Sequence, residues 1–205
     1  PTPCSPATAD RTATPPAEPD RPAPTFERAT GRGAPYHRRL TESFLAHDLQ
    51  RANEIVGEVL ALHSVETVVS EMIRPTLADL GEGWARGSVG VATEHLASHF
   101  LRQRLVLWLT TAPPPRPVAP VVLACAPGDW HDLSLLMFAV MLSRRRWPIA
   151  YLGPSVPLAD LAAFVASTQP SAVVIVAMHE STVQALTDWP LAMPEAAAAG
   201  SPPVL

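Results

Sequence analysis

A short polar segment between an apolar run and a helical pattern places a histidine two residues after an aspartate. Residues 127–134 read Pro-Gly-Asp-Trp-His-Asp-Leu-Ser, so Asp129 precedes His131. Neutral imidazole binds transition metals well, and a carboxylate that accepts the other ring N–H fixes the tautomer of the ligand. The segment therefore predicts a metal-ligating His131 supported by Asp129. Taken alone, it is also open to a second interpretation, a surface loop in which Asp129 or Asp132 caps the next helix.

A second group of candidate residues lies earlier in the chain. Trp84 is followed, after nine residues, by the pair Glu94-His95. Tryptophan offers a large aromatic contact surface, glutamate accepts hydrogen bonds from hydroxyl groups, and histidine donates or ligates. These residue types suit one wall of a ligand site. A core tryptophan at a helix end beside an exposed Glu-His pair is the alternative that the residues alone leave open.

Helical periodicity over residues 36–112 predicts the scaffold of this second group. Apolar residues recur at helical spacing in four stretches with short connections, which favours an antiparallel four-helix bundle. We expect Asp48 to cap the second helix, Pro75 to kink the third, and Ser88 or Thr93 to open the fourth. Breaks in the chain around the tryptophan are expected at three glycines: Gly81, Gly83 and Gly87.

The periodicity changes after a stretch with five prolines at residues 112–120, where we place the boundary to a second domain at 113–205. Apolar runs typical of buried strands then alternate with amphipathic helices, which predicts a doubly wound parallel sheet with a Rossmann-like α/β fold. Ligands of such sheets bind beyond the carboxyl ends of the strands, where the Asp-x-His segment lies. The expected order is strand 118–126, helix 133–145, strand 149–152, helix 157–165, strand 171–177, a helix from 182, and a fourth strand that begins at 203–205.

Bulk composition limits the function classes. A net charge of -4 gives no electrostatic case for nucleic acid, and the longest clean apolar run, 135–142, is too short for a membrane span. Cys4 and Cys125 are far apart and lack the spacing of a zinc site or a disulfide framework. Without a visible signal peptide, the cytoplasm is the expected compartment. Residues 1–35 hold nine of the 24 prolines and almost nothing apolar, which predicts a disordered tail.

The pattern Asp129-x-His131-x-x-Ser134 resembles the Asp-x-His-x-x-Gly motif of cobalamin-binding domains. In that family the histidine binds cobalt on its lower face, the aspartate supports the histidine, and the nucleotide tail of the cofactor enters a slot along the sheet. The resemblance implies that the cofactor is bound by Asp129, Trp130, His131, Ser134 and Ala177, with His131 as the metal ligand.

This chain departs from the motif of that family in three places. Ser134 replaces the glycine of the motif, and Ala177 stands where the family has serine. The sequence ends before the Gly-Gly element that follows the fourth strand of the family. We therefore expect an α/β domain that is truncated at its C-terminus.

Trp84-x9-Glu94-His95 resembles the bundle signature of CarH-type and AerR-type light-dependent regulators, in which these residues pack against the upper ligand of cobalamin. The resemblance covers residues 36–205. It implies that the chain is a light sensor rather than an enzyme. Such a sensor binds adenosylcobalamin through His131 and loses the upper ligand in light. The loss then changes the homo-oligomer or the contact with an output partner. No DNA-binding helix-turn-helix precedes the bundle, so direct contact with nucleic acid is not expected.

Position 85 is the main departure from the CarH pattern. CarH has there a histidine that binds cobalt from above after illumination, whereas this chain has Ala85. The open alternatives are that His95, His99 or water takes this place, or that the photochemistry differs from that of CarH. The architecture also resembles that of the photocobilins, which pair cobalamin with a bilin. That resemblance leaves biliverdin open as a second chromophore, although neither cysteine is an obvious thioether anchor.

Two other function classes remain open at this point. A corrinoid methyl carrier of a methyltransferase system also joins a helical bundle to an Asp-x-His domain, but it lacks the Trp-x9-Glu-His signature. A cofactor-free interaction module would make Asp129 and His131 accidental.

Overall fold

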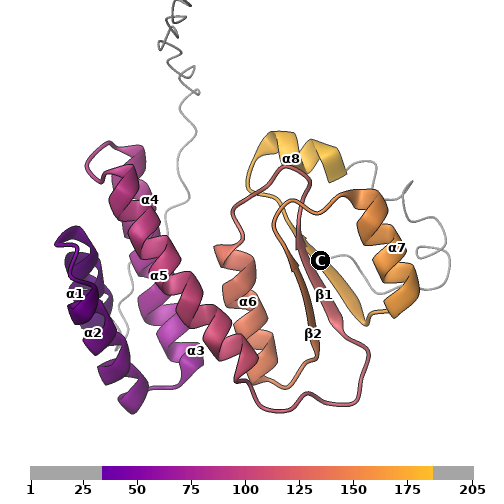
Figure 1. Cartoon of the computed structure of the whole chain (residues 1–205), viewed down its shortest axis with the longest axis horizontal. Coiled ribbons are helices and arrows are strands. Elements are labelled where there is room, and N and C mark those ends of the chain that lie inside the picture. The colour runs from indigo at the N-terminus through magenta and orange to yellow at the C-terminus, as the bar shows by residue number, and fades with distance from the viewer. Residues whose placement is uncertain (1–33, 187–205) are drawn as a thin grey trace, which may run out of the picture.

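The computed structural model describes residues 34–186, which form a helical N-terminal region followed by a parallel sheet with helices on both faces (Figure 1). This arrangement confirms the expected fold class. The expected tail and the strand expected at 203–205 lie outside the described residues, except that Ala34 and Pro35 already belong to the first helix.

The helical region contains four helical rods, of which the third has three consecutive parts. Its elements are α1 (Ala34–Leu45), α2 (Leu49–Leu62), the third rod of α3 (Val65–Val68), η1 (Val69–Ile73) and α4 (Arg74–Ala85), and α5 (Val91–Thr110). Asp48 caps α2 as predicted, since its carboxylate accepts the Arg51 N–H at 2.8 Å. Apolar faces of all four rods pack into one core, and its largest fully buried side chains include Leu40, Phe44, Ile55, Met72 and Leu101.

The irregularity expected at Pro75 takes the form of a π-helical turn, η1, just before it. Pro75 has no N–H, and in a regular helix its ring would clash with the carbonyl of Glu71. The Arg74 N–H donates instead to the Val69 carbonyl, five residues back, and this wider turn accommodates the proline. The third rod therefore continues through Pro75.

The expected breaks at Gly81 and Gly83 are wrong, because both residues lie inside α4. Only Gly87, with a φ of 75°, ends the helix in the left-handed region. A Cβ at position 83 would lie 2.5 Å from Cγ2 of Val89, and the N–H groups of Ser88 and Val89 both donate to the Gly83 carbonyl. Gly83 thus allows the chain to fold back closely over the end of α4.

The expected start of the fourth helix at Ser88 or Thr93 is also wrong, since α5 begins at Val91 after Gly90. Both hydroxyl groups have other partners. Ser88 donates to the carbonyl of Gly83, and the Thr93 oxygen lies 2.8 Å from Nε2 of His47. Neither side chain therefore caps α5, and the N–H groups of the turn instead satisfy the Gly83 carbonyl near the end of α4.

The sheet has the strand order β2-β1-β3, with all pairs parallel. Its elements are β1 (Val121–Cys125), α6 (Leu133–Arg144), β2 (Ile149–Gly153), α7 (Leu158–Thr168), β3 (Ala172–Val176) and α8 (Glu180–Ala185). The central strand β1 is buried along its whole length, as its continuous apolar run predicts. Alternate residues of β1 face opposite sides, so Val122 packs toward α7 and Leu123 toward α6.

The helical region and the sheet share a core through α6. Leu136 and Val140 of α6 are buried among the side chains of the helical region, while Leu135 and Ala139 pack on β1. The chain passes from one region to the other through α5, which packs along α6 (Figure 1). Among residues 34–186, we find no helix with both the length and the apolar character that crossing a bilayer demands.

Candidate functional site

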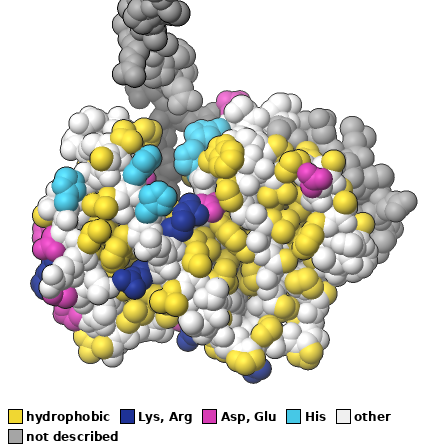
Figure 2. All heavy atoms as spheres, in the orientation of Figure 1, with side chains coloured by type: hydrophobic (Ala, Val, Ile, Leu, Met, Phe, Trp, Pro, Cys, Tyr) yellow, Lys and Arg dark blue, Asp and Glu magenta, His cyan; other side chains and the backbone are white. Residues whose placement is uncertain are grey.

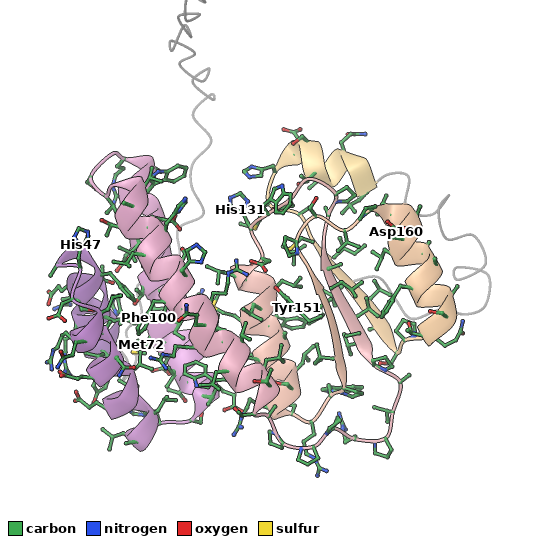
Figure 3. All side chains as sticks on the ribbon, in the orientation of Figure 1. His47, Met72, Phe100, His131, Tyr151 and Asp160 are labelled. Atoms are coloured by element: carbon green, nitrogen blue, oxygen red, sulfur yellow. The ribbon has the colours of Figure 1, made fainter. Side chains whose placement is uncertain are left out.

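The loop between β1 and α6 carries the Asp-x-His segment at the carboxyl end of the central strand. Figure 3 shows His131 at that end of the sheet, on the side that faces the helical region. Gly128 turns the loop with a φ of 80°, and its N–H donates to the hydroxyl of Ser155 at 3.1 Å. Both backbone polar groups of Asp129 are hydrogen-bonded: its N–H donates to the carbonyl of Ala126, and its carbonyl accepts from the N–H of Ser155.

The carboxylate of Asp129 is completely buried and accepts from three donors. Oδ1 accepts the backbone N–H of His131 at 3.0 Å and lies 3.2 Å from Nδ1 of its ring, while Oδ2 accepts the N–H of Met178. Burial by itself raises the pKa of Asp129, but the hydrogen bonds from His131 and Met178 outweigh it and hold that pKa below its usual value. The carboxylate is therefore ionised at neutral pH.

An ionised carboxylate accepts but does not donate, so Nδ1 of His131 carries the proton and Nε2 has the free lone pair. The side chain of His131 is 63% exposed, and Nε2 is thus available to a metal. A single imidazole suits a metal whose other ligands arrive with a cofactor. The predicted support of His131 by Asp129 is present in the structure.

The end of β3 completes this side of the site. Ala177, half-buried, stands where a serine hydroxyl was expected from the resemblance, and the backbone N–H of the next residue, Met178, reaches Asp129 instead. The ring of His179 packs edge-on against that of His131 with centroids 5.0 Å apart. The sequence singles out His179 among the remaining histidines by its place shortly after a strand, on the ligand side, but assigns it no role.

Two further predicted residues of the loop lie at the surface. Trp130 is 70% exposed, and Ser134 is exposed in the first turn of α6. Both are accessible to a ligand that covers His131.

The second group of predicted residues lies at the α4–α5 turn. Trp84 is in the last turn of α4 and is 53% exposed. Glu94 lies in the first turn of α5, and its carboxylate lies 2.6 Å from Nδ1 of His95 and accepts the hydroxyl of Ser98 at 2.5 Å. His95 itself is exposed, so its Nε2 side is presented outward.

The α4–α5 turn and the β1–α6 loop lie at the same end of the molecule (Figure 1), and Figure 2 shows histidine side chains on both sides of the junction between the two regions. Between residues 34 and 186, no direct hydrogen bond, ion pair or ring contact joins Trp84, Glu94 or His95 to His131. The structure thus brings the predicted residues to one end of the molecule in two separate groups.

A buried cluster below His131 was not predicted from the sequence. Asp132, 1% exposed, binds the guanidinium of Arg102 from α5 through both carboxylate oxygens and accepts the hydroxyl of Tyr151 from β2 at 2.7 Å. Asp132 occupies the N-cap position of α6, yet its side chain makes no capping hydrogen bond. A tyrosine in an apolar strand was the available signal, because a buried hydroxyl needs a partner.

Comparisons with known proteins agree with this geometry. Two family models, each described as a B12 binding domain, match residues 36–107 and 119–189. The HTH-type transcriptional repressor CarH of Myxococcus xanthus is 37% identical over 149 residues, which are 68% of this chain and 50% of that protein. The repressor CarA of the same organism is 30% identical over 159 residues, 77% of this chain and 51% of that protein.

Among solved structures, the monomethylamine corrinoid protein of Methanosarcina barkeri is similar with a TM-score of 0.64. Its sequence identity is 14%, over 81% of this chain and 79% of that one, so it shows the shared fold alone. The chain spans about half the length of the curated relatives it matches. The curated relatives are named as transcriptional repressors and not as enzymes. The two matched domains and the identity to CarH show that this chain belongs to the CarH-like family of cobalamin-binding proteins.

Proposed function

We propose that this chain is a light-sensing module that binds adenosylcobalamin between the two groups of site residues. The single observation that carries the proposal is the exposed His131, whose Nδ1 is held by a buried carboxylate at the carboxyl end of β1. In the proposal, Nε2 of His131 binds cobalt on the lower face, and Trp84 with Glu94 and His95 lies toward the upper face. Bound cobalamin supplies a Co–C bond that light breaks.

The lower side is built to keep one tautomer of His131. The carboxylate of Asp129 accepts hydrogen bonds from two backbone N–H groups and from the ring of His131. If the imidazole ring flipped, the buried carboxylate would lose the hydrogen bond from Nδ1, which is unfavourable. The ring of His179 packs against the same ring in a T-shaped contact. These residues orient Nε2 before the cofactor arrives.

Trp84, Glu94 and His95 form the proposed upper side of the site and suit a ligand group that dissociates in light. Trp84 offers an exposed aromatic face, and the Glu94 carboxylate is presented next to exposed His95. A carboxylate accepts hydrogen bonds from ribose hydroxyls, which favours the adenosyl group as the upper ligand. We propose that loss of this group frees the contact surface of Trp84, and that the α4–α5 end of the helical region then changes position and alters the oligomer or the contact with an output partner.

The proposal includes cobalamin and no second chromophore. Cys125 is buried in β1, and its burial raises the pKa of the thiol to about 12, which makes it a poor nucleophile for attachment of biliverdin. The methyl-carrier alternative rests on a fold likeness of 14% identity, whereas the sequence likeness is to repressors.

Illumination of the loaded protein tests the light-sensing proposal. Purified protein is mixed in the dark with adenosylcobalamin, and a parallel sample is mixed with methylcobalamin. Absorption spectra and size-exclusion profiles are recorded before and after green light. We expect an irreversible spectral change and a change in elution volume for the adenosyl form. Stable binding with no light-driven spectral change that is selective for the adenosyl form would support a methyl carrier instead.

A matched pair of variants ties the light response to the upper group. Trp84→Ala is expected to bind cobalamin but to show a weakened or absent change of elution volume, because it lacks the proposed contact. The control is Trp147→Ala, which removes a tryptophan that precedes β2 and stacks with Arg116, at the opposite end of the strands from His131. A normal light response in Trp84→Ala would contradict the role given to this residue.

A further inference from the structure

A buried carboxylate, Asp132, links the helical region to the sheet through an ion pair with Arg102. Asp132 directly follows His131, and its carboxylate receives Nη1 of Arg102 at 2.7 Å and Nη2 at its other oxygen. The hydroxyl of Tyr151 donates to the same carboxylate at 2.7 Å, and Figure 3 shows Tyr151 beside β2, below His131. Three elements, α5, α6 and β2, thus meet at one carboxylate.

The buried negative charge of Asp132 is stabilised by its contacts with Arg102 and Tyr151. The side chain is 1% exposed, so an unpaired carboxylate there would be very unfavourable. Burial alone raises the pKa of Asp132, but the hydrogen bonds from Arg102 and Tyr151 outweigh burial, hold that pKa below its usual value and keep the group ionised. Hydrogen bonding to Asp132 likewise raises the pKa of Arg102. The bidentate geometry fixes the direction of the guanidinium as well as its position.

Arg102 lies on the same helix, α5, as two histidines near the α4–α5 turn. His95, His99 and Arg102 are spaced by four and three residues, so they lie on one face of the helix. Arg102 reaches the residue next to His131, and the same face continues toward the α4–α5 turn through the exposed His99 and His95. The ion pair therefore connects the helix that carries the upper group to the loop that carries the lower ligand.

We propose that Arg102 is a positioning residue, which acts through Asp132 to hold α5 and the His131 loop at the spacing that a bound cobalamin needs. The inference rests on the proposed cofactor site, but its first test does not need the cofactor. It adds a structural link that the Asp129–His131 pair alone does not provide, because within residues 34–186 the hydrogen-bond partners of Asp129 all belong to the sheet domain.

Hydrogen exchange of the cobalamin-free protein gives the first test. In Arg102→Met, we expect amide exchange in residues 128–133 to rise by about tenfold or more, because the loop loses its link to α5. Arg102→Lys keeps the charge but not the bidentate geometry and should show an intermediate increase. The control is Arg39→Met, which removes another bidentate contact, the exposed pair of Arg39 with Glu58 inside the helical region.

A second variant protects the test from loss of the fold. If Arg102→Met does not fold, Tyr151→Phe removes one hydrogen bond to Asp132 and leaves the ion pair in place. It should raise exchange in the same segment by a smaller factor. Exchange in 128–133 that matches the Arg39→Met protein in each of these variants that folds would overturn the positioning role.

The cobalamin-loaded protein gives the second test. We expect Arg102→Met to bind cobalamin with a reduced fraction of His131-ligated cobalt in its spectrum, and Arg102→Lys to restore part of that fraction. A wild-type level of ligated cobalt in Arg102→Met would contradict the inference. Should the wild-type protein bind no cobalamin, the proposed function fails, while the exchange experiment still decides whether Arg102 holds the loop.

Discussion

Asp129 is the residue on which the geometry of His131 depends most. Each of its carboxylate oxygens accepts from a donor, and one of those donors, the N–H of Met178, lies in the segment that follows β3. Only a carboxylate satisfies all of these donors, since an amide in the same place presents an NH2 group to at least one N–H.

Asp129→Asn is therefore expected to lower both stability and cofactor affinity. The mismatch leaves a buried donor unsatisfied, which costs about 1–3 kcal/mol of unfolding free energy. Loss of the partner of a metal-ligating histidine typically weakens metal binding about 10- to 100-fold. Urea unfolding and titration with cobalamin measure the two effects. Asp160→Asn, at an exposed position of α7, is the control and should change neither; an unaffected Asp129→Asn protein would contradict this account.

At this scale, sequence reasoning found what is local and missed what is distant. Asp129 and His131 are two residues apart, so their contact follows from a loop of ordinary geometry. Arg102 and Tyr151 reach the same place from α5 and β2. No spacing rule connects these positions, because tertiary packing alone brings them together.

At the scale of elements, the α4–α5 turn sets where Trp84 and Glu94 lie relative to each other. The two helices follow one another through a turn in which two N–H groups donate to the carbonyl of Gly83. The glycines around Trp84 were interpreted as helix breakers because of their intrinsic preferences. The structure keeps two of them inside α4, since one is needed for the close approach of Val89. The approach of Val89 to Gly83 is a tertiary contact, so the pattern of residues around Trp84 does not predict it.

Gly83→Ala should destabilise the protein, whereas Gly81→Ala in the same helix should not. The added Cβ at 83 would meet Cγ2 of Val89 at 2.5 Å, and Val89 is held by its own backbone hydrogen bond, so we expect a loss of about 1–3 kcal/mol. A Cβ at 81 meets nothing within 4 Å, and alanine is favoured over glycine in a helix by about 0.5–1 kcal/mol. Urea unfolding of both variants measures the difference. Equal stabilities would show that the turn does not pack as described.

At the scale of the whole molecule, α6 makes the two regions one folding unit. It buries one set of side chains against the helical region and another against β1. The order of a helical region and a doubly wound sheet could be predicted from the change of periodicity near residue 112. The way in which the two regions join could not, because α6 reads in the sequence as an ordinary helix of the sheet.

Leu136→Ala is expected to destabilise both regions together. Leu136 is 1% exposed and lies in the core of the helical region, so a cavity there should cost about 2–5 kcal/mol. Because the core is shared, unfolding should remain a single transition that far-ultraviolet circular dichroism and tryptophan fluorescence report alike. Phe138→Ala, at a position that is 42% exposed on the same helix, should cost about 1 kcal/mol or less. Two separate transitions in the wild-type protein would contradict the shared core.

The central claim, that His131 binds cobalt from below, is tested most directly by electron paramagnetic resonance of the protein loaded with cob(II)alamin. The nitrogen below the cobalt splits each cobalt line into three if it is nitrogen-14 and into two if it is nitrogen-15. Protein labelled with nitrogen-15 only in histidine is compared with unlabelled protein and with labelled His131→Ala, and labelled His63→Ala serves as the control at the end of α2. We predict two-line splitting in the labelled wild-type and His63→Ala proteins, and loss of that splitting in His131→Ala. Three-line splitting in the labelled wild-type protein would mean that the cofactor keeps its own base, and that His131 is not the ligand.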